Sequence, residues 1–200
     1  NHDLKVLKRD LELLVETRTL ELQKAKATLE KIAFFDPLTN IPNRRFFIDQ
    51  SNRLIQSCNR RNVMIAFGII DIDDFKVLND TYGHNVGDAV LVAFSKNLKH
   101  FFRIDDAFCR HGGEEFAFAV AIENATDLKS LADRLISGIR NIVIEMDRNT
   151  QLSITVSIGI KLCNPSSDLD LEIEIKQADI ALYQSKENGK NKYTIVSDNQ

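Results

Sequence analysis

Cysteine is scarce in this sequence. Its 200 residues include three, Cys58, Cys109 and Cys163, with no CxxC pair and no histidine at metal-ligand spacing. An odd number of isolated thiols excludes a secreted disulfide framework and is typical of a reducing compartment. A run of about 18 apolar residues is also absent, so we expect no membrane-spanning segment. Because the chain begins with Asn1 and shows no signal peptide, we expect a cytoplasmic domain, membrane-tethered only through an upstream segment.

A strong excess of charge of either sign is also missing. The formal net charge is −3, with 44% hydrophobic and 28% charged residues. These values exclude a disordered or collagen-like chain. The mild negative charge argues against a nucleic-acid polymer as partner, because dedicated binders of such polymers are usually basic. A small polyanionic ligand remains compatible, since a bound cation can neutralise phosphates locally.

The first 33 residues contain neither glycine nor proline, and their apolar residues recur at intervals of three or four. This spacing predicts a helix of about 50 Å whose apolar stripe needs a partner. The stripe consists of Leu4, Leu7, Leu11, Val15, Arg18, Leu22, Ala25, Leu29 and Ile32. We predict that residues 1–33 form a parallel coiled coil. A helix folded back on its own domain is the alternative, because Arg18 and one stutter interrupt the heptad pattern.

From residue 34 onward, strand patterns alternate with helical ones. Strands are predicted at 63–70, 107–110, 115–122, 153–162 and 192–196. Helices are predicted at 43–59, 87–102, 128–143 and 169–188, and a loop is expected between the first strand and residue 87. Because one strand pair forms a hairpin, we expect an α/β (α+β) fold with a mixed central sheet flanked by helices.

An acidic cluster, DIDDFK at 71–76, follows the most apolar strand. Strand alternation places Asp71 and Asp73 on one face and Asp74 on the other. A buried carboxylate is costly without a cation, and a divalent ion with hard oxygen ligands, such as Mg²⁺, would compensate it. Alternatively, Asp73 or Asp74 caps the next helical turn.

Two further segments carry polar residues around glycines. In RHGGEEF (110–116), adjacent carboxylates at a glycine turn are explained if a cation lies between the turn and Asp71; a solvated hairpin is the alternative. In NDTYGHNVGD (79–88), Asn79 and Asp88 could bind a flat polar edge such as that of guanine. Alternatively, Asp88 caps the following helix, and His84 alone is more often structural.

These motifs resemble the GGDEF domain of diguanylate cyclases. The similarity also includes DPLT (36–39) and PNR (42–44) as the opening motif, and ADIALYQSKENGKN (178–191) as the closing motif. It covers roughly residues 34–196, in the family's order throughout. The resemblance implies a fold related to adenylyl cyclase and polymerase palm domains. It also implies that residues 34–200 form the catalytic domain after a signalling helix at 1–33.

The resemblance further implies that two GTP molecules are joined into cyclic di-GMP with release of two pyrophosphates. Mg²⁺ or Mn²⁺ would be held by Asp71, the carbonyl of Ile72 and Glu114. Glu114, or less readily Glu115, would accept the proton. The residues implied in substrate binding are Leu38, Lys76, Asn79, His84, Asp88, Lys186 and Lys190. Lys76 would also offset transition-state charge, and Lys190 stands where the family often has arginine.

Because each domain holds one GTP, the resemblance implies a homodimer with facing sites. The RIDD segment (103–106) matches the family's RxxD inhibitory site, which implies that Arg103, Asp106 and Arg134 bind cyclic di-GMP. A surface Arg–Asp pair is the alternative. For the whole domain, the alternatives are a nucleotide-sensing module without catalysis and a purely dimeric relay.

Overall fold

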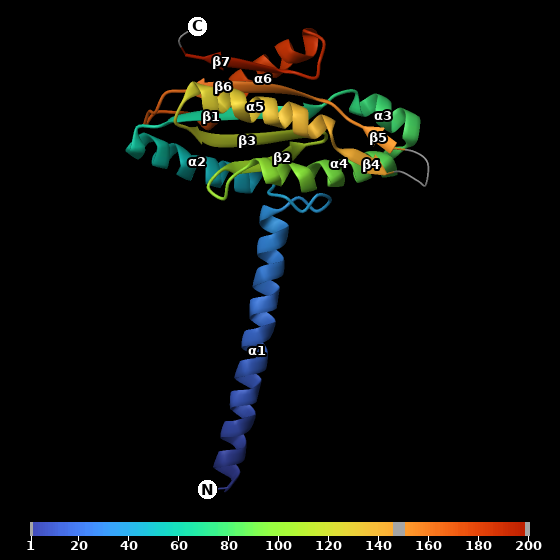
Figure 1. Cartoon of the computed structure of the whole chain (residues 1–200). Helices are drawn as coiled ribbons and strands as arrows, with labels where there is room; N and C mark the ends of the chain where they lie inside the picture. Colours follow the sequence, from blue (N-terminus) through green and yellow to red (C-terminus); the bar gives the residue numbers. More distant parts are fainter. Residues whose placement is uncertain (1, 146–150, 199–200) are drawn as a thin grey trace.

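The computed structural model describes residues 2–145 and 151–198. Within them, a five-stranded sheet has the order β2-β3-β1-β6-β7 (Figure 1). Its strands are β1 (Met64–Ile72), β2 (Ala107–Gly112), β3 (Glu115–Ile122), β6 (Val156–Cys163) and β7 (Tyr193–Ser197). β1 pairs antiparallel with both neighbours, whereas β6 and β7 are parallel. The predicted mixed sheet is therefore confirmed.

Helices cover both faces of this sheet (Figure 1). The helices of the described residues are α1 (His2–Phe34), which lies outside these layers, α2 (Arg44–Arg61), α3 (Phe75–Tyr82), α4 (His84–Leu98), the 3₁₀ helix η1 (Lys99–Phe101), α5 (Ala125–Arg140) and α6 (Leu171–Glu187). Alternate β1 residues such as Phe67 pack with α2 and α6, while intervening residues such as Ile70 pack with α4 and α5. β1 is thus apolar on both faces, as its sequence predicts.

Helix α1 projects away from the domain as a stalk (Figure 1). The apolar residues of the predicted stripe are exposed along it, with Leu4 at 69% and Ile32 at 71%. The helix therefore does not fold back on its own domain. The coiled coil stays a prediction, and the exposed stripe agrees with it. No helix within the described residues combines the length and apolarity needed to cross a lipid bilayer.

Two predictions about local structure were wrong. The segment after β1 is not a continuous loop, because it forms the eight-residue helix α3, and α4 begins at His84 rather than Gly87. Gly83, at φ 86°, separates these two helices. A short antiparallel pair, β4 (Val143–Glu145) and β5 (Gln151–Ser153), was not predicted. Elements this short offer too few positions for a periodic pattern to emerge.

Helix α6 lies unusually close to β6. A Cβ placed on Gly159 would be 2.0 Å from both the Ala178 carbonyl oxygen and the Leu182 backbone nitrogen. Because both clashing atoms belong to the backbone, the helix as a whole would have to move. This contact brings the C-terminal end of α6 against the end of the sheet that carries the acidic motifs.

We predict that Gly159→Ala lowers the free energy of unfolding by about 3 kcal/mol or more, because no side chain can move aside for the methyl group. Urea unfolding followed by circular dichroism measures this. Gly112→Ala is the matched control, since a Cβ there meets nothing within 4 Å. Its stability should stay within about 0.5 kcal/mol of the wild type. Equal stability of the two variants would contradict the close-packing argument.

Candidate active site

The site begins where β1 ends. Asp71 is 6% exposed, and the sheet register places it opposite Glu115 of β3. The backbone N–H of Ile72 donates to the carbonyl of Glu114 at 3.4 Å. The predicted convergence of the strand end with the glycine turn is therefore observed. Glu114 thus lies beside Asp71 and Ile72 in the fold, although it is distant from them in the sequence.

Two lysines from the end of α6 and the turn after it approach the same acidic segment. Lys186 Nζ lies 2.8 Å from Asp71 Oδ2, and Lys190 Nζ lies 2.6 Å from Asp74 Oδ1. The hydrogen bond to Asp74 raises the pKa of Lys190. Asp74 precedes α3 with φ 56° and makes no side-chain capping bond, so the capping alternative does not hold for it. Lys76, in the first turn of α3, is exposed.

The donors around Asp71 suit a hard cation. Burial raises the pKa of Asp71, Lys186 opposes this rise, and the charges of Glu114 and Asp73 add to it. The Lys186 ammonium thus occupies the position of a compensating cation. No group of three His, Cys, Asp or Glu side chains arranged for a metal occurs among the described residues. Two carboxylates and a backbone carbonyl are the donor set available, and oxygen donors of this kind fit Mg²⁺.

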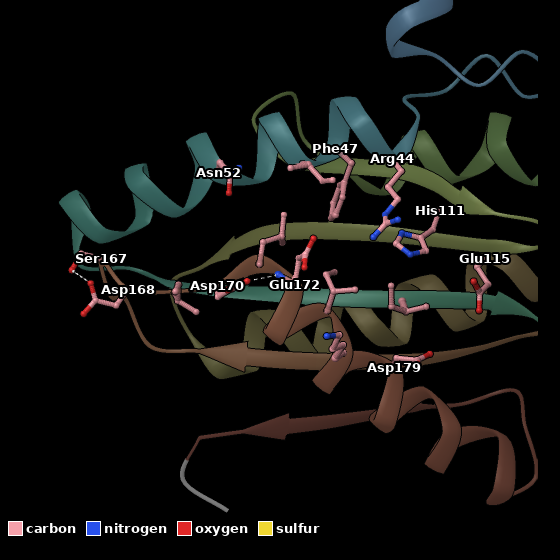
Figure 2. Close-up of a pocket in the computed structure, with 16 residues that line it drawn as sticks. Arg44, Phe47, Asn52, His111, Glu115, Ser167, Asp168, Asp170, Glu172 and Asp179 are labelled. Atoms are coloured by element: carbon pink, nitrogen blue, oxygen red, sulfur yellow. Dashed lines mark hydrogen bonds between the residues drawn. The ribbon is translucent and has the colours of Figure 1, made fainter.

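The two adjacent glutamates have different surroundings. Glu115 lines a cavity of about 700 Å³ between α2 and α6, whereas Glu114 does not. Glu115, His111 and Asp179 lie toward one end of that cavity, and Asp168 lies toward the other (Figure 2). Burial and the neighbouring charges of Asp71 and Asp179 raise the pKa of Glu115. Because consecutive strand residues face opposite ways, the two glutamates are not expected to play the same role.

A second group of predicted residues lies on α3 and α4. Asn79 Oδ1 is buried without a hydrogen-bond partner, and a Cβ on Gly87 would lie 1.9 Å from it. Gly87 therefore leaves room for the Asn79 amide between the helices. Asp88 and His84 are exposed on α4, and Asp88 is not its cap, because the helix already begins at His84 after Gly83. Leu38 is half-buried and packs against the core cluster that contains α3 and α4 residues.

The family described as "Diguanylate cyclase, GGDEF domain" matches residues 33–192. The chain belongs to the GGDEF family. Its curated relatives include the bifunctional diguanylate cyclase/cyclic di-GMP phosphodiesterase MucR of Pseudomonas aeruginosa, which is 32% identical over 94% of this chain and 27% of that protein. The probable diguanylate cyclase DgcC of Escherichia coli is 31% identical over 88% of this chain and 47% of its own. The chain thus spans less than half of these two relatives.

Solved GGDEF structures share the fold. The coiled coil and GGDEF domain of DgcB from Caulobacter crescentus, in complex with c-di-GMP, has a TM-score of 0.79 and 29% identity. The match covers 93% of this chain and 99% of that one. The diguanylate cyclase SiaD of Pseudomonas aeruginosa, in complex with its activator SiaC, has a TM-score of 0.74 and 26% identity, covering 96% and 73%. The expected fold is therefore confirmed, stalk helix included.

An arginine of this GGDEF domain links the stalk to the glycine turn. Arg110 Nη1 contacts Asp36 Oδ1 at 3.1 Å, and Arg110 Nε donates to the Gly113 carbonyl at 2.9 Å. Asp36 also accepts bonds from the backbone N–H and hydroxyl of Thr39. Although burial opposes it, these bonds hold the pKa of Asp36 below its ordinary value of 3.8. The ion pair joins residues 74 positions apart, so spacing could not reveal it.

His111 is another residue that the sequence reasoning left unassigned. It lies between Arg44 of α2 and Asp179 of α6 (Figure 2). Burial, and then Arg44, lower the pKa of His111, while Asp179 opposes the shift. Its Nδ1 is buried without a hydrogen-bond partner. Its position directly before the glycine turn is the sequence feature that could have indicated a role. The sequence could not show its partners, because they come from distant helices.

The predicted inhibitory residues also come together in the structure. Arg103, Asp106 and Arg134 line one cavity of about 430 Å³. The Arg103 backbone N–H donates to Asp106 Oδ2 at 2.7 Å, and Arg134 Nη2 donates to the Phe101 carbonyl at 3.1 Å. Burial raises the pKa of Asp106. Attraction to Arg103 opposes that rise, so a product site and a surface Arg–Asp pair both stay predictions here.

We predict that Asp36→Asn lowers the free energy of unfolding by about 1–3 kcal/mol at pH 7, because the hydrogen bonds to a charged acceptor are weakened. The pKa of Asp36 is lowered in the folded state, so its contribution is present above its ordinary pKa of 3.8 and lost as pH falls below it. Urea unfolding at pH 7 and at acidic pH measures the difference between variant and wild type.

Asp49→Asn is the control for this pH dependence, because Asp49 is exposed and pairs only with Arg53 on the same helix. Its effect should stay within about 0.5 kcal/mol at either pH. A difference between Asp36→Asn and wild type that remained undiminished in acid would show that the lost stability does not come from the Asp36 charge.

Proposed function

We propose that this domain is a diguanylate cyclase that condenses two GTP molecules into cyclic di-GMP and two pyrophosphates. The observation that carries the proposal is the convergence of the buried Asp71, the Glu114 turn and the Lys186 ammonium at one end of the sheet. Curated relatives named as diguanylate cyclases support it. So does the DgcB structure, which is described as a complex with c-di-GMP.

Guanine binding is proposed for the α3–α4 residues. The buried, unpartnered amide oxygen of Asn79 is an acceptor that lacks a donor. Guanine presents N–H donors along one edge, and Asn79 and Asp88 would accept from them. Leu38 would contribute apolar contact, and His84 would lie beside the nucleotide. The unsatisfied Asn79 is the feature that an apolar packing role does not explain.

The triphosphate is proposed to lie against Lys76, Lys186 and Lys190. Lys186 and Lys190 already face carboxylates in the protein alone, so they can exchange one anionic partner for another. Phosphoryl transfer depends mainly on positioning and on neutralising charge. Lys76 would offset the charge that develops on the phosphates in the transition state, whereas Lys186 and Lys190 would bind the triphosphate in the ground state and the transition state alike.

A divalent cation, Mg²⁺ or Mn²⁺, is proposed to be held by Asp71, the Ile72 carbonyl and Glu114. When bound, such an ion polarises the phosphate and lowers the pKa of a hydroxyl. Glu114 would accept the proton from the 3′-hydroxyl as that oxygen bonds to the α-phosphate of the second GTP and the α–β phosphoanhydride bond breaks to release pyrophosphate. Glu115 is the weaker candidate for this role, because its side chain lines the separate cavity between α2 and α6.

Catalysis would require two domains, because each site provides one half of the reacting pair. The exposed apolar stripe of α1 would bring two domains together, since pairing of two stalks raises the effective concentration of the second site. The two sites would then face each other across a two-fold axis. The proposal therefore places the chain in a homodimer with GTP as substrate and cyclic di-GMP as product.

We predict that the wild type converts GTP into cyclic di-GMP in the presence of Mg²⁺, with a specific activity that rises with protein concentration. Glu114→Gln should lower turnover at least about 100-fold, because it removes a carboxylate that binds the metal and takes the proton. Chromatographic detection of cyclic di-GMP measures this.

Glu115→Gln and Glu123→Gln serve as comparisons for Glu114→Gln. Glu123 is exposed just after β3, 3.6 Å from Arg61, and lines the cavity at Arg103, so its variant should keep the wild-type initial rate, measured before product accumulates. Glu115→Gln should fall between the two. Binding of GTP without product at high protein concentration would favour a sensing module instead. Unchanged turnover in a folded Glu114→Gln variant would remove Glu114 from the reaction.

The cavity at Arg103, Asp106 and Arg134 is proposed as a product-binding site. Two guanidinium groups beside one cavity can bind the phosphates of cyclic di-GMP in bidentate fashion. Arg103→Ala should leave the initial rate unchanged and raise the cyclic di-GMP concentration for half-inhibition about tenfold or more.

Progress curves with added cyclic di-GMP test this role. Arg140→Ala is the matched control, because Arg140 is an exposed arginine on the same helix as Arg134 but does not line the cavity. Inhibition that persisted unchanged in Arg103→Ala would remove this site from the proposal.

A further inference from the structure

Asp73 is a buried carboxylate with an unusual set of partners. It is 9% exposed and takes part in no salt bridge within 4.0 Å among the described residues. Instead, its Oδ1 accepts from Ser157 Oγ at 2.6 Å, and its Oδ2 accepts from Thr155 Oγ1 at 2.7 Å. The Asp73 backbone N–H also donates to the Thr155 carbonyl at 2.9 Å. These bonds tie the end of β1 to the beginning of β6.

A third donor reaches Asp73 from the turn that follows α6. The backbone N–H of Asn191 donates to Asp73 Oδ2 at 3.0 Å, across 118 positions of sequence. This is the bond that ties the distant turn to Asp73, because the other two donors come from the neighbouring strand region. Asp73 therefore fixes the turn relative to the end of β1.

The turn is conformationally costly. Gly189, Lys190 and Asn191 have φ values of 102°, 58° and 51°, all in the left-handed region. For residues with a Cβ this conformation costs of order 1 kcal/mol each, and it persists only where surrounding contacts fix it. The Lys190 N–H donates to the Ser185 carbonyl at 3.1 Å, and the Asp73 carboxylate holds the next residue. Together these bonds determine where the Lys190 side chain starts.

We propose that Asp73 is a positioning residue: it holds the 189–191 turn through the Asn191 N–H and thereby places Lys190 at the triphosphate. The inference rests on the proposed function, because it requires that Lys190 binds the phosphates of GTP. It separates the acids of the DIDD motif by role. Asp71 faces a cation, Asp74 pairs with the Lys190 ammonium, and Asp73 organises the backbone that carries Lys190.

Both oxygens of Asp73 accept bonds from protein donors, as expected of a residue that positions the backbone. A metal ligand acts through its charge, whereas a positioning acceptor needs only an oxygen at the right place. Asn keeps such an oxygen, and the hydroxyls of Thr155 and Ser157 can rotate to suit an amide. Asp73→Asn should therefore preserve function that Asp73→Ala loses.

Binding of a fluorescent GTP analogue and steady-state kinetics provide the test. Asp73→Ala should weaken analogue binding and raise KM for GTP about tenfold, with kcat changed less than about threefold, because ground-state and transition-state binding through Lys190 are lost together. For Asp73→Asn, analogue affinity, KM and kcat should each stay within about threefold of wild type, as expected when a neutral acceptor replaces a charged one. An Asp73→Asn variant as defective as Asp71→Asn would overturn the proposal and favour a metal ligand.

A double-mutant cycle shows whether Asp73 acts through Lys190. In a Lys190→Ala background, Asp73→Ala should add less than about twofold to the loss of affinity, because the positioned group is already missing. Lys192→Ala is the matched control from the same turn. Lys192 is exposed and donates to the Asn188 carbonyl, and in this background Asp73→Ala should keep its full effect. Additive losses with Lys190→Ala would contradict the proposal.

Folding of each variant is checked by circular dichroism. If Asp73→Ala does not fold, Asp73→Ser takes its place, since its shorter side chain withdraws the acceptor while staying polar. Amide hydrogen exchange at Asn191 is a readout that requires no nucleotide: exchange should quicken at least about tenfold in the Ala or Ser variant and stay near wild type in the Asn variant. Unchanged exchange at Asn191 would overturn the proposal. A wild type that makes no cyclic di-GMP would instead refute the proposed function.

Discussion

The buried charge of Asp71 is the constraint around which this end of the molecule is arranged. β1 is apolar on both faces until Asp71, and burial there raises the pKa of the carboxyl. A charge in such a position needs opposite charge nearby. The sheet register brings the Glu114 turn to it from one side, and the close approach of α6 to Gly159 brings Lys186 from another. The same packing that builds the core therefore assembles the charged groups.

Neighbouring acids in this region are compensated in different ways. Asp71 meets an ammonium group, whereas Asp73 is surrounded by hydroxyl and backbone donors. Asp74 has a left-handed backbone and turns outward to Lys190. These three carboxylates lie within four positions, and the charge of Asp73 still adds to the raised pKa of Asp71. Each carboxylate at the end of β1 therefore has its own compensating partner, set by the direction in which the backbone turns.

Local patterns in the sequence predicted most of the fold. The apolar run of β1 and the predicted ranges of α2 and α6 agree with the structure to within two residues at each helix end, because each depends on adjacent residues. The helix α3 was missed because eight residues with two buried positions show no clear period. The acidic and glycine motifs indicated a shared site. By contrast, the Asp36–Arg110 pair and the Asp73–Asn191 bond join segments 74 and 118 positions apart, so only the folded chain reveals them.

The junction of α1 with the domain is stiff rather than loose. Phe35 bridges to Pro42, the Asn43 side chain donates to the Ala33 carbonyl, and Arg110 joins Asp36 to Gly113. A rotation of the stalk about its long axis would therefore act as torque on the glycine hairpin instead of dissipating in a slack tether. The stalk helix is thus coupled mechanically to the hairpin that carries Glu114.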